Sequence, residues 1–262
     1  MNNSQGSATV SKGLKVLACF STPRRSFTMA EIARHTGFDR ATARRLCLSL
    51  VEAGYLSLVG RELSLTPKIL SIAGGYLGAN DIGLSVQPVL DRFAESEGRD
   101  IALAVKDGDQ ALYVVTSRSD ASRLSFGLTV GSSLPLPSTA VGRALLAQCP
   151  AAEIGAVLAR VPLPRHTEQT RCDPAAIEAA VADAAATGYA YVENEFELGA
   201  AAIAVPVGTL SGSPAVVGTT QTVNAFGTAV QRERALDALR QTAMTLRRLS
   251  LFAQTAPGLS AR

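Results

Sequence analysis

Residues 29–56, MAEIARHTGFDRATARRLCLSLVEAGYL, determine how the first part of this 262-residue chain is interpreted. Thr28 and Glu31 have the spacing of a capping box, which begins a helix, and Gly37 supplies the backbone freedom for a tight turn. Asp39 is then placed to cap a second helix. Four arginines stand among the apolar positions of these two helices: Arg34, Arg40, Arg44 and Arg45.

The segments before and after residues 29–56 predict the other helix and the hairpin of the N-terminal unit. Residues 55–67, YLSLVGRELSLTP, alternate between apolar and polar positions around a VGRE turn and predict a β-hairpin after Gly54 ends the second helix. Residues 11–20, SKGLKVLACF, predict a helix before the quoted stretch, with Leu14 and Phe20 on its apolar side. Three helices followed by a hairpin indicate a winged helix-turn-helix, which we place at residues 11–67.

Charge is distributed unevenly along the chain. Residues 1–80 contain ten Lys/Arg and four Asp/Glu, a formal charge of +6, whereas residues 81–262 contain fifteen and eighteen, a formal charge of −3. This asymmetry is typical of a basic module that meets a polyanion, attached to a mildly acidic body. Because the second helix of a helix-turn-helix enters the major groove, DNA contact is the preferred interpretation of the arginines over a solvated basic face.

Individual DNA contacts follow from the expected geometry. Arg40 and Arg44 are one helical turn apart, and arginine reads guanine through two hydrogen bonds, while threonine contacts a base or a phosphate. Arg61 in the hairpin turn and Lys68 after it are expected to contact phosphate. The full set of expected DNA-contacting residues is Thr28, Asp39, Arg40, Ala41, Thr42, Arg44, Arg45, Arg61 and Lys68.

The rest of the chain predicts a linker helix over 68–80 and an α+β body over 81–254, with tails at 1–10 and 255–262. The body starts with an amphipathic run, 82–97, whose apolar side includes Leu84, Val86, Val89, Leu90 and Phe93. Strands are predicted at 101–108, 111–117, 123–131, 189–193, 200–208 and 215–223, and helices near 139–148, 151–160, 174–187 and 228–253. Strands on either side of helices indicate an α+β fold.

Several classes of protein are disfavoured. No stretch approaches the roughly 18 apolar residues of a membrane span, and the first ten residues lack the regions of a signal peptide. The four cysteines have no CxxC spacing and are expected as free thiols in a reducing cytoplasm. His35 and His166 are the only histidines, and no GxSxG motif occurs, so no metal, cofactor or enzymatic activity is expected.

Three stretches, in this order, resemble the IclR family of bacterial transcription regulators. Residues 36–56 are similar to the family's recognition helix. Residues 128–147, LTVGSSLPLPSTAVGRALLA, are similar to the stretch that joins a strand to the helix beside the effector pocket. Residues 188–207, GYAYVENEFELGAAAIAVPV, are similar to a strand pair on the other side of that pocket. Residues 122–132, SRLSFGLTVGS, most resemble the subgroup that serves aromatic-acid catabolism, including the β-ketoadipate pathway.

The resemblance implies a winged helix-turn-helix joined by a helix to a GAF-like effector domain. It also implies a homodimer or homotetramer that binds a palindromic operator in double-stranded DNA and a small-molecule carboxylate effector. By the same resemblance, Leu134, Ala140 and Val141 line the effector pocket. The positions of Val192 and Ala202 are polar in some relatives and contact the effector there; both are apolar here, which favours a larger or less polar ligand.

A carboxylate in such a pocket needs hydrogen-bond donors. The small residues at the start of the predicted 139–148 helix leave N–H groups free, and Ser138 and Thr139 add hydroxyls. Arg123 and Phe126 are candidates to pair with and stack on an aromatic acid. The run Glu193, Glu195, Glu197 could supply metal ligands or paired carboxylates, but a solvated strand edge is preferred. The expected effector-contacting residues are Arg123, Phe126, Leu134, Ser138, Thr139, Ala140, Val141, Val192, Glu195 and Ala202.

The sequence thus predicts a cytoplasmic, effector-responsive transcription regulator of catabolic genes that senses an aromatic acid or a ring-cleavage product. Two alternatives stay open. One is a constitutive DNA-binding regulator with a vestigial sensor, and the other is an enzyme of small acids tethered to DNA. Whether transcription rises or falls on binding depends on where the operator lies.

Overall fold

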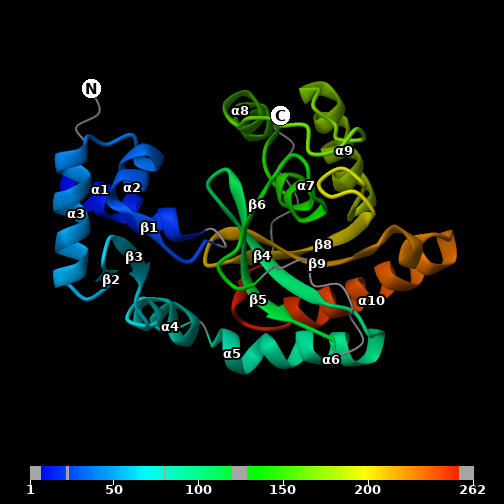
Figure 1. The fold of residues 1–262 in the computed structure, drawn as a ribbon. Helices are drawn as coiled ribbons and strands as arrows, with labels where there is room; N and C mark the ends of the chain where they lie inside the picture. Colours follow the sequence, from blue (N-terminus) through cyan, green and yellow to red (C-terminus); the bar gives the residue numbers. More distant parts are fainter. Residues whose placement is uncertain (1–6, 22–23, 80, 120–128, 254–262) are drawn as a thin grey trace, which may run out of the picture. The chain divides into compact units, whose positions relative to one another are not determined.

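The chain divides into two units after residue 80. The structure, a computed structural model, describes residues 7–21, 24–79, 81–119 and 129–253 (Figure 1). The predicted tail at 255–262 lies outside these ranges. None of the helices in the described ranges is both long and apolar enough to cross a membrane.

The first unit contains the three helices and the hairpin expected of a winged helix-turn-helix. A two-residue strand before the second helix also joins the hairpin, with Phe27 opposite Leu63, which makes a three-stranded sheet. A strand this short carries no alternation that a sequence could display. The elements are α1 (Ala8–Ala18), η1 (Cys19–Ser21), β1 (Phe27–Thr28), α2 (Met29–Thr36), α3 (Arg40–Glu52), β2 (Leu56–Val59) and β3 (Glu62–Leu65).

The start of the chain departs from the prediction in two respects. Helix α1 begins at Ala8, inside the segment predicted as a tail over 1–10. Leu14, predicted on the apolar side of this helix, has a side chain that is 61% exposed. Val16 and Phe20, four residues apart on one helical face, are the residues that enter the core of this unit.

The predicted helix starts are confirmed. Thr28 accepts a hydrogen bond from the Glu31 N–H, and the Glu31 carboxylate accepts one from the Thr28 N–H, which completes the capping box. Gly37 has the left-handed φ of 71° that the turn between α2 and α3 requires. Asp39 caps α3 by accepting from the Thr42 N–H at 2.8 Å.

Helix α4 (Ile69–Ala79) occupies the segment predicted as a linker helix. The helix is strongly apolar, yet none of its residues is buried. Leu70 and Ile72 are 66% and 57% exposed.

The second unit is built on an antiparallel sheet whose strands are ordered β10-β8-β9-β4-β5-β6, with β7 also paired to β8. Helices α7, α8 and α9 cover one face of this sheet, and α6 and α10 cover the other (Figure 1). The strands are β4 (Ile101–Asp107), β5 (Gln110–Ser117), β6 (Ser133–Pro135), β7 (Ala190–Glu193), β8 (Ala200–Leu210), β9 (Ser213–Thr222) and β10 (Phe252–Ala253). The helices are α5 (Ile82–Ser85), α6 (Gln87–Glu97), α7 (Ala140–Leu146), α8 (Ala151–Arg160), α9 (Pro174–Thr187), η2 (Val223–Phe226) and α10 (Ala229–Arg247).

Three predicted elements of this unit are corrected. The run 82–97 is divided into α5 and α6, with Pro88 in the first turn of α6, and Leu84 is 81% exposed rather than inward. Of the predicted strand 123–131, residues 123–128 lie outside the described ranges and residues 130–131 form a turn, after which the short strand β6 pairs with β5. The last predicted helix ends at Arg247, after which β10 joins the sheet beside β8.

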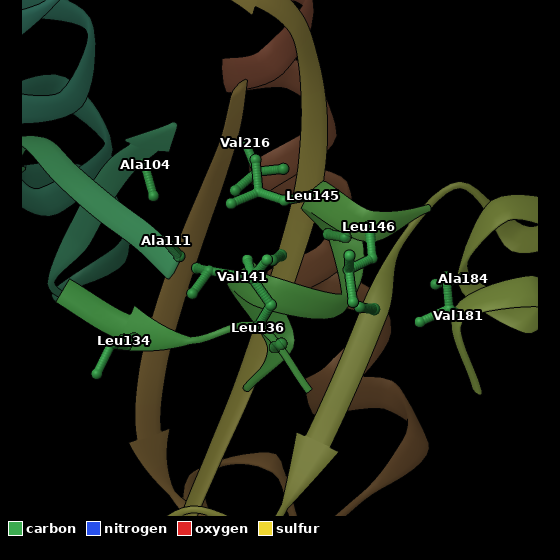
Figure 2. Close-up of a cluster of buried hydrophobic side chains, with 14 of the residues drawn as sticks. Ala104, Ala111, Leu134, Leu136, Val141, Leu145, Leu146, Val181, Ala184 and Val216 are labelled. Carbon is green, nitrogen blue, oxygen red and sulfur yellow. The ribbon is translucent and has the colours of Figure 1, made fainter. Parts of the chain in front are cut away.

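Helix α7 lies directly against the sheet and the segment before it. Figure 2 shows Val141 and Leu145 of this helix gathered with side chains from β4, β5 and β9. A side chain at Gly142 would place its Cβ 2.2 Å from the backbone oxygen of Leu136, so only glycine permits this approach. The close approach holds the start of α7 against the segment that precedes it, beside a cavity of the second unit.

Candidate functional site

Helix α3 presents a basic face to solvent. Its buried side is formed by Ala43, Leu46 and Cys47, so Arg40, Arg44 and Arg45 lie on the exposed side together with Ala41, while Thr42 is half-buried. Within the described residues, no carboxylate forms an ion pair with these three guanidinium groups. Their charge is therefore available to a phosphate or a base edge. Arg61, in the turn between β2 and β3, is also exposed.

Two of the residues expected to contact DNA have side chains engaged in helix caps. The Thr28 N–H, followed by the Thr28 hydroxyl and Arg24, lowers the pKa of Glu31 to about 2. The Thr42 N–H lowers the pKa of Asp39. Thr28 and Asp39 therefore set where α2 and α3 begin.

Lys68 has a structural role that the sequence did not reveal. Its ammonium donates to the backbone oxygen of Ala53 at 2.7 Å, just beyond the end of α3, and lies 5.0 Å from the centre of the Tyr55 ring. A cation at the C-terminal end of a helix interacts favourably with the helix dipole. Lys68 thus ties the start of the linker segment to the end of α3.

A cavity in the second unit opens between α7, the sheet and the segment after β7. It encloses about 60 Å³ and is mostly apolar. Seven of the ten residues expected to contact an effector line it: Leu134, Thr139, Ala140, Val141, Val192, Glu195 and Ala202. The other lining residues are Tyr113, Phe196, Glu197, Ala200, Thr219 and Thr220, and of these only Glu197 drew attention in the sequence. Arg123 and Phe126 lie outside the described residues.

The cavity's size and lining bear on the kind of ligand. Its volume is well below the roughly 300–1,000 Å³ of pockets that hold drug-sized ligands, so this conformation does not favour a larger ligand. Val192 and Ala202 add apolar surface from neighbouring strands, where they are register partners. The lining favours a compact, largely apolar molecule.

The two hydroxyls at the start of α7 differ from the prediction. Thr139 caps the helix, accepting from the Gly142 N–H at 3.1 Å and donating to the Pro135 oxygen at 2.7 Å. Its hydroxyl is therefore already engaged. Ser138 does not line the cavity, but its hydroxyl is buried and has no hydrogen-bond partner among the described residues.

Glu195 is the clearest correction to the sequence analysis, because it is buried rather than part of a solvated strand edge. Asn194 adopts a left-handed φ of 57°, just after β7 ends, and the following side chain lies in the interior. Arg143, which is 1% exposed, donates to the two Glu195 oxygens at 2.7 and 2.6 Å. The Arg143 Nε also donates to the Pro137 oxygen at 2.8 Å.

Arg171 completes this cluster from the opposite side. Its backbone N–H donates to Glu195 at 3.1 Å, and its half-exposed guanidinium lies 3.4 Å from the same carboxylate. Sequence reasoning missed both arginines. The available signal was an arginine in the otherwise apolar segment AVGRALL, all of which is buried.

The acidic run Glu193, Glu195, Glu197 does not form a cluster of metal ligands in the described residues. Within the described ranges, no group of three or more His, Cys, Asp or Glu side chains is arranged to hold a metal ion. Cys19, Cys47, Cys149 and Cys172 are free thiols. Burial raises the pKa of the Cys47 thiol to about 11, which disfavours its reactive thiolate form.

The two units match two known domain families. Residues 9–60 match the IclR helix-turn-helix domain, and residues 74–248 match the bacterial transcriptional regulator IclR C-terminal domain. The chain belongs to the IclR family. The predicted fold class, a helix-turn-helix unit followed by an α+β effector domain, is confirmed, and the protein is a transcriptional regulator rather than an enzyme.

Individual IclR-family relatives agree with this assignment. The chain is 34% identical over 204 residues to the Pca regulon regulatory protein of Pseudomonas putida, covering 78% of this chain and 70% of that protein. This likeness confirms the resemblance to the aromatic-acid subgroup. An IclR transcriptional regulator structure from Silicibacter sp. TM1040 has a TM-score of 0.85 and 28% identity, covering 95% of this chain and 98% of that one.

A further structure shares the fold. It is an IclR homolog from Microbacterium hydrocarbonoxydans complexed with 4-hydroxybenzoate, with a TM-score of 0.74 and 23% identity. The likeness covers 92% of this chain and 98% of that chain.

Proposed function

We propose that this IclR-family regulator binds a palindromic operator as a homodimer or homotetramer and responds to a compact aromatic carboxylic acid or a ring-cleavage product. It would thereby control genes for the catabolism of such acids. The observation that carries the proposal is the mostly apolar cavity at the start of α7, in a unit separate from the basic face of α3.

The DNA half of the proposal rests on the uncompensated guanidinium groups of Arg40, Arg44 and Arg45. In a helix-turn-helix, the N-terminal part of the second helix contacts base edges, and these residues occupy the first two turns of α3. Arg61, in the turn of the hairpin, is placed to contact a phosphate. Thr28 and Asp39 contribute by setting the helix starts.

The effector half rests on the balance of apolar and polar groups around the cavity. A buried carboxylate needs compensating donors, otherwise its desolvation is prohibitive. The Thr139 cap takes the N–H of Gly142, and the N–H groups of Ala140 and Val141 have no partner within the helix. An aromatic ring would then occupy the space beside Leu134, Val192 and Ala202.

The names of the relatives support an aromatic acid as the effector class. One relative is named for the Pca regulon, and a solved homolog was crystallised with 4-hydroxybenzoate. Coupling to DNA requires only that the acid bind more tightly to one of two arrangements of the oligomer. A constitutive regulator with a vestigial sensor would lack this differential affinity.

The test combines calorimetry with DNA binding on the intact wild-type protein. Benzoate, 4-hydroxybenzoate, protocatechuate and cis,cis-muconate are titrated calorimetrically, with benzyl alcohol as a control that lacks the carboxylate. An operator selected from a random double-stranded DNA pool is then titrated with and without each acid. We expect at least one acid to bind and to change the operator affinity, and benzyl alcohol to do neither. Tight operator binding that no acid alters would establish the constitutive alternative instead.

A further inference from the structure

The hydroxyl groups that line the cavity differ in whether they already form hydrogen bonds within the protein. Thr139 is engaged in capping α7, and Thr219 donates to the backbone oxygen of Asp100 at 2.6 Å. Thr220 is half-buried. Tyr113 is only 4% exposed, and its hydroxyl forms no hydrogen bond with any described residue.

The position of Tyr113 is determined by its backbone. Its N–H donates to the Ser132 oxygen at 2.9 Å, and its own oxygen accepts from the Gly131 N–H at 2.8 Å. On the other side, it is the register partner of Ala104 in β4. With β4 bonded on one side and the turn before β6 on the other, the backbone of Tyr113 is fixed and its ring lines the cavity.

Tyr113 lines the cavity, and a hydroxyl there with no protein partner among the described residues is open to a hydrogen bond from a ligand or a water molecule. Burial raises the pKa of Tyr113 well above its usual range, so the group stays protonated and can both donate and accept. The cavity itself is where a partner would lie.

The charges near the cavity decide what kind of partner fits. A second ligand carboxylate would need its own compensating cation, but the guanidinium groups of Arg143 and Arg171 both contact Glu195. The exposed carboxylate of Glu197, which also lines the cavity, adds a repulsion. A neutral hydroxyl on the ligand needs no cation and, like tyrosine, both donates and accepts.

We propose that Tyr113 is a specificity-determining residue. Its hydroxyl forms a hydrogen bond with a hydroxyl group on the effector's aromatic ring, and the effector's carboxylate binds elsewhere in the cavity. This inference rests on the proposed function and narrows it to hydroxylated aromatic acids. The ring hydroxyl would lie at β5.

The experiment removes the hydroxyl from Tyr113, removes the ring hydroxyl from the ligand, and compares the two effects on affinity in a double-mutant-style cycle. Wild-type protein and Tyr113→Phe, both full-length, are titrated calorimetrically with benzoate, 3-hydroxybenzoate and 4-hydroxybenzoate. Wild type should bind one of the hydroxybenzoates roughly three- to tenfold more tightly than benzoate, the worth of one net hydrogen bond. In Tyr113→Phe this preference should fall to about one, with benzoate affinity retained. Tyr189→Phe, a half-buried tyrosine that does not line this cavity, should keep the wild-type preference.

The melting temperature of ligand-free Tyr113→Phe supplies a second readout. Since the hydroxyl has no protein partner, its removal should not lower that temperature, whereas a structural hydroxyl would. A hydroxybenzoate preference that persists in Tyr113→Phe would overturn the inference while leaving the proposed function intact. Equal losses for benzoate and the hydroxybenzoates would also overturn it, since Tyr113 would then serve the carboxylate. If wild type bound none of the three acids, the inference that the effector is a hydroxylated aromatic acid would be contradicted.

Discussion

Arg143 is a charged residue in a helix whose other members are apolar, and the carboxylate that it binds, Glu195, lies 52 residues further along the chain. Both side chains are almost fully buried, at 1% and 6% exposed. A buried ion pair gains little net stability, because desolvation offsets the attraction, but removal of one partner leaves an uncompensated charge. The pair joins α7 to the segment that carries Glu195 and Phe196 along the cavity wall.

At this scale we predict that Arg143→Met destabilises the second unit by about 3–5 kcal/mol, because the Glu195 carboxylate is left buried without its main partner. Urea unfolding followed by circular dichroism measures the change. The double variant Arg143→Met/Glu195→Met should recover most of the loss, since two apolar side chains of similar volume replace the pair. Arg160→Met, which removes an exposed ion pair with Asp109, should change stability little. A double variant no more stable than the single one would contradict this account.

Helices α2 and α3 illustrate how local chemistry builds an element. Each begins at a side chain that satisfies a free backbone N–H, and the turn between them needs the left-handed backbone of Gly37. The apolar stripe of α3 then directs Ala43 and Leu46 inward, and the arginines face solvent as a consequence. The basic face is therefore a property of the whole helix.

The capping box of α2 predicts a pH dependence. The pKa of Glu31 is lowered from 4.5 to about 2 in the folded state, so its stabilisation is present above pH 4.5 and is lost as the pH falls toward 2. Glu31→Gln should therefore reduce protection of the α2 amides against hydrogen exchange, corrected for intrinsic rates, at pH 6. The difference from wild type should shrink between pH 4.5 and 2. Glu52→Gln, which removes a carboxylate of α3 outside the capping box, should leave the protection of the α2 amides unchanged. A pH-independent difference for Glu31→Gln would exclude the carboxylate as the cause.

The exposed side of α3 gives a prediction about DNA. Arg44→Ala should weaken binding of the selected operator by roughly 1–3 kcal/mol if it reads a base, with much less effect on random DNA. Arg61→Ala should weaken both kinds of DNA alike and lower the salt slope by about one. Mobility-shift titrations at several salt concentrations measure both effects, with Arg92→Ala in α6 as a control. Unchanged operator affinity in Arg44→Ala would remove this residue from the interface.

At the scale of the molecule, two units of opposite net charge carry separate tasks, with α4 at the end of the first unit. An apolar helix with no buried residue is unusual in a monomer, since contiguous apolar surface of this kind marks an interaction site. A palindromic operator is bound by a protein with two-fold symmetry, and the apolar surface of α4 is a candidate contact between two copies of the chain.

We accordingly predict that Leu70→Glu weakens self-association, because it places a charge on the apolar surface of α4. Light scattering at micromolar concentration should give a dimer or tetramer for wild type and a smaller species for the variant. Operator affinity should fall in parallel. Leu198→Glu, at an exposed position of the second unit, is the control for added charge. A wild-type monomer in the presence of operator DNA would refute the assembly part of the proposal.

The sequence by itself determined the features that depend on neighbours in the chain. The capping residues, the turn at Gly37, the apolar stripe of α3 and most strands follow from spacing and backbone chemistry over a few residues. The resemblance of two stretches to a known family also placed five cavity-lining positions, and the expected start of a helix placed Thr139.

Only the tertiary structure decided what distant segments do to one another. Glu195 is indistinguishable in sequence from the exposed Glu197, yet the turn at Asn194 and the remote Arg143 make it a buried, paired carboxylate. In the sequence, Tyr113 is one residue of a predicted apolar strand. In the structure, it lines the cavity between α7 and the sheet, and its hydroxyl has no partner among the described residues. Burial and pairing depend on contacts across the fold, and periodicity along the chain contains no information about them.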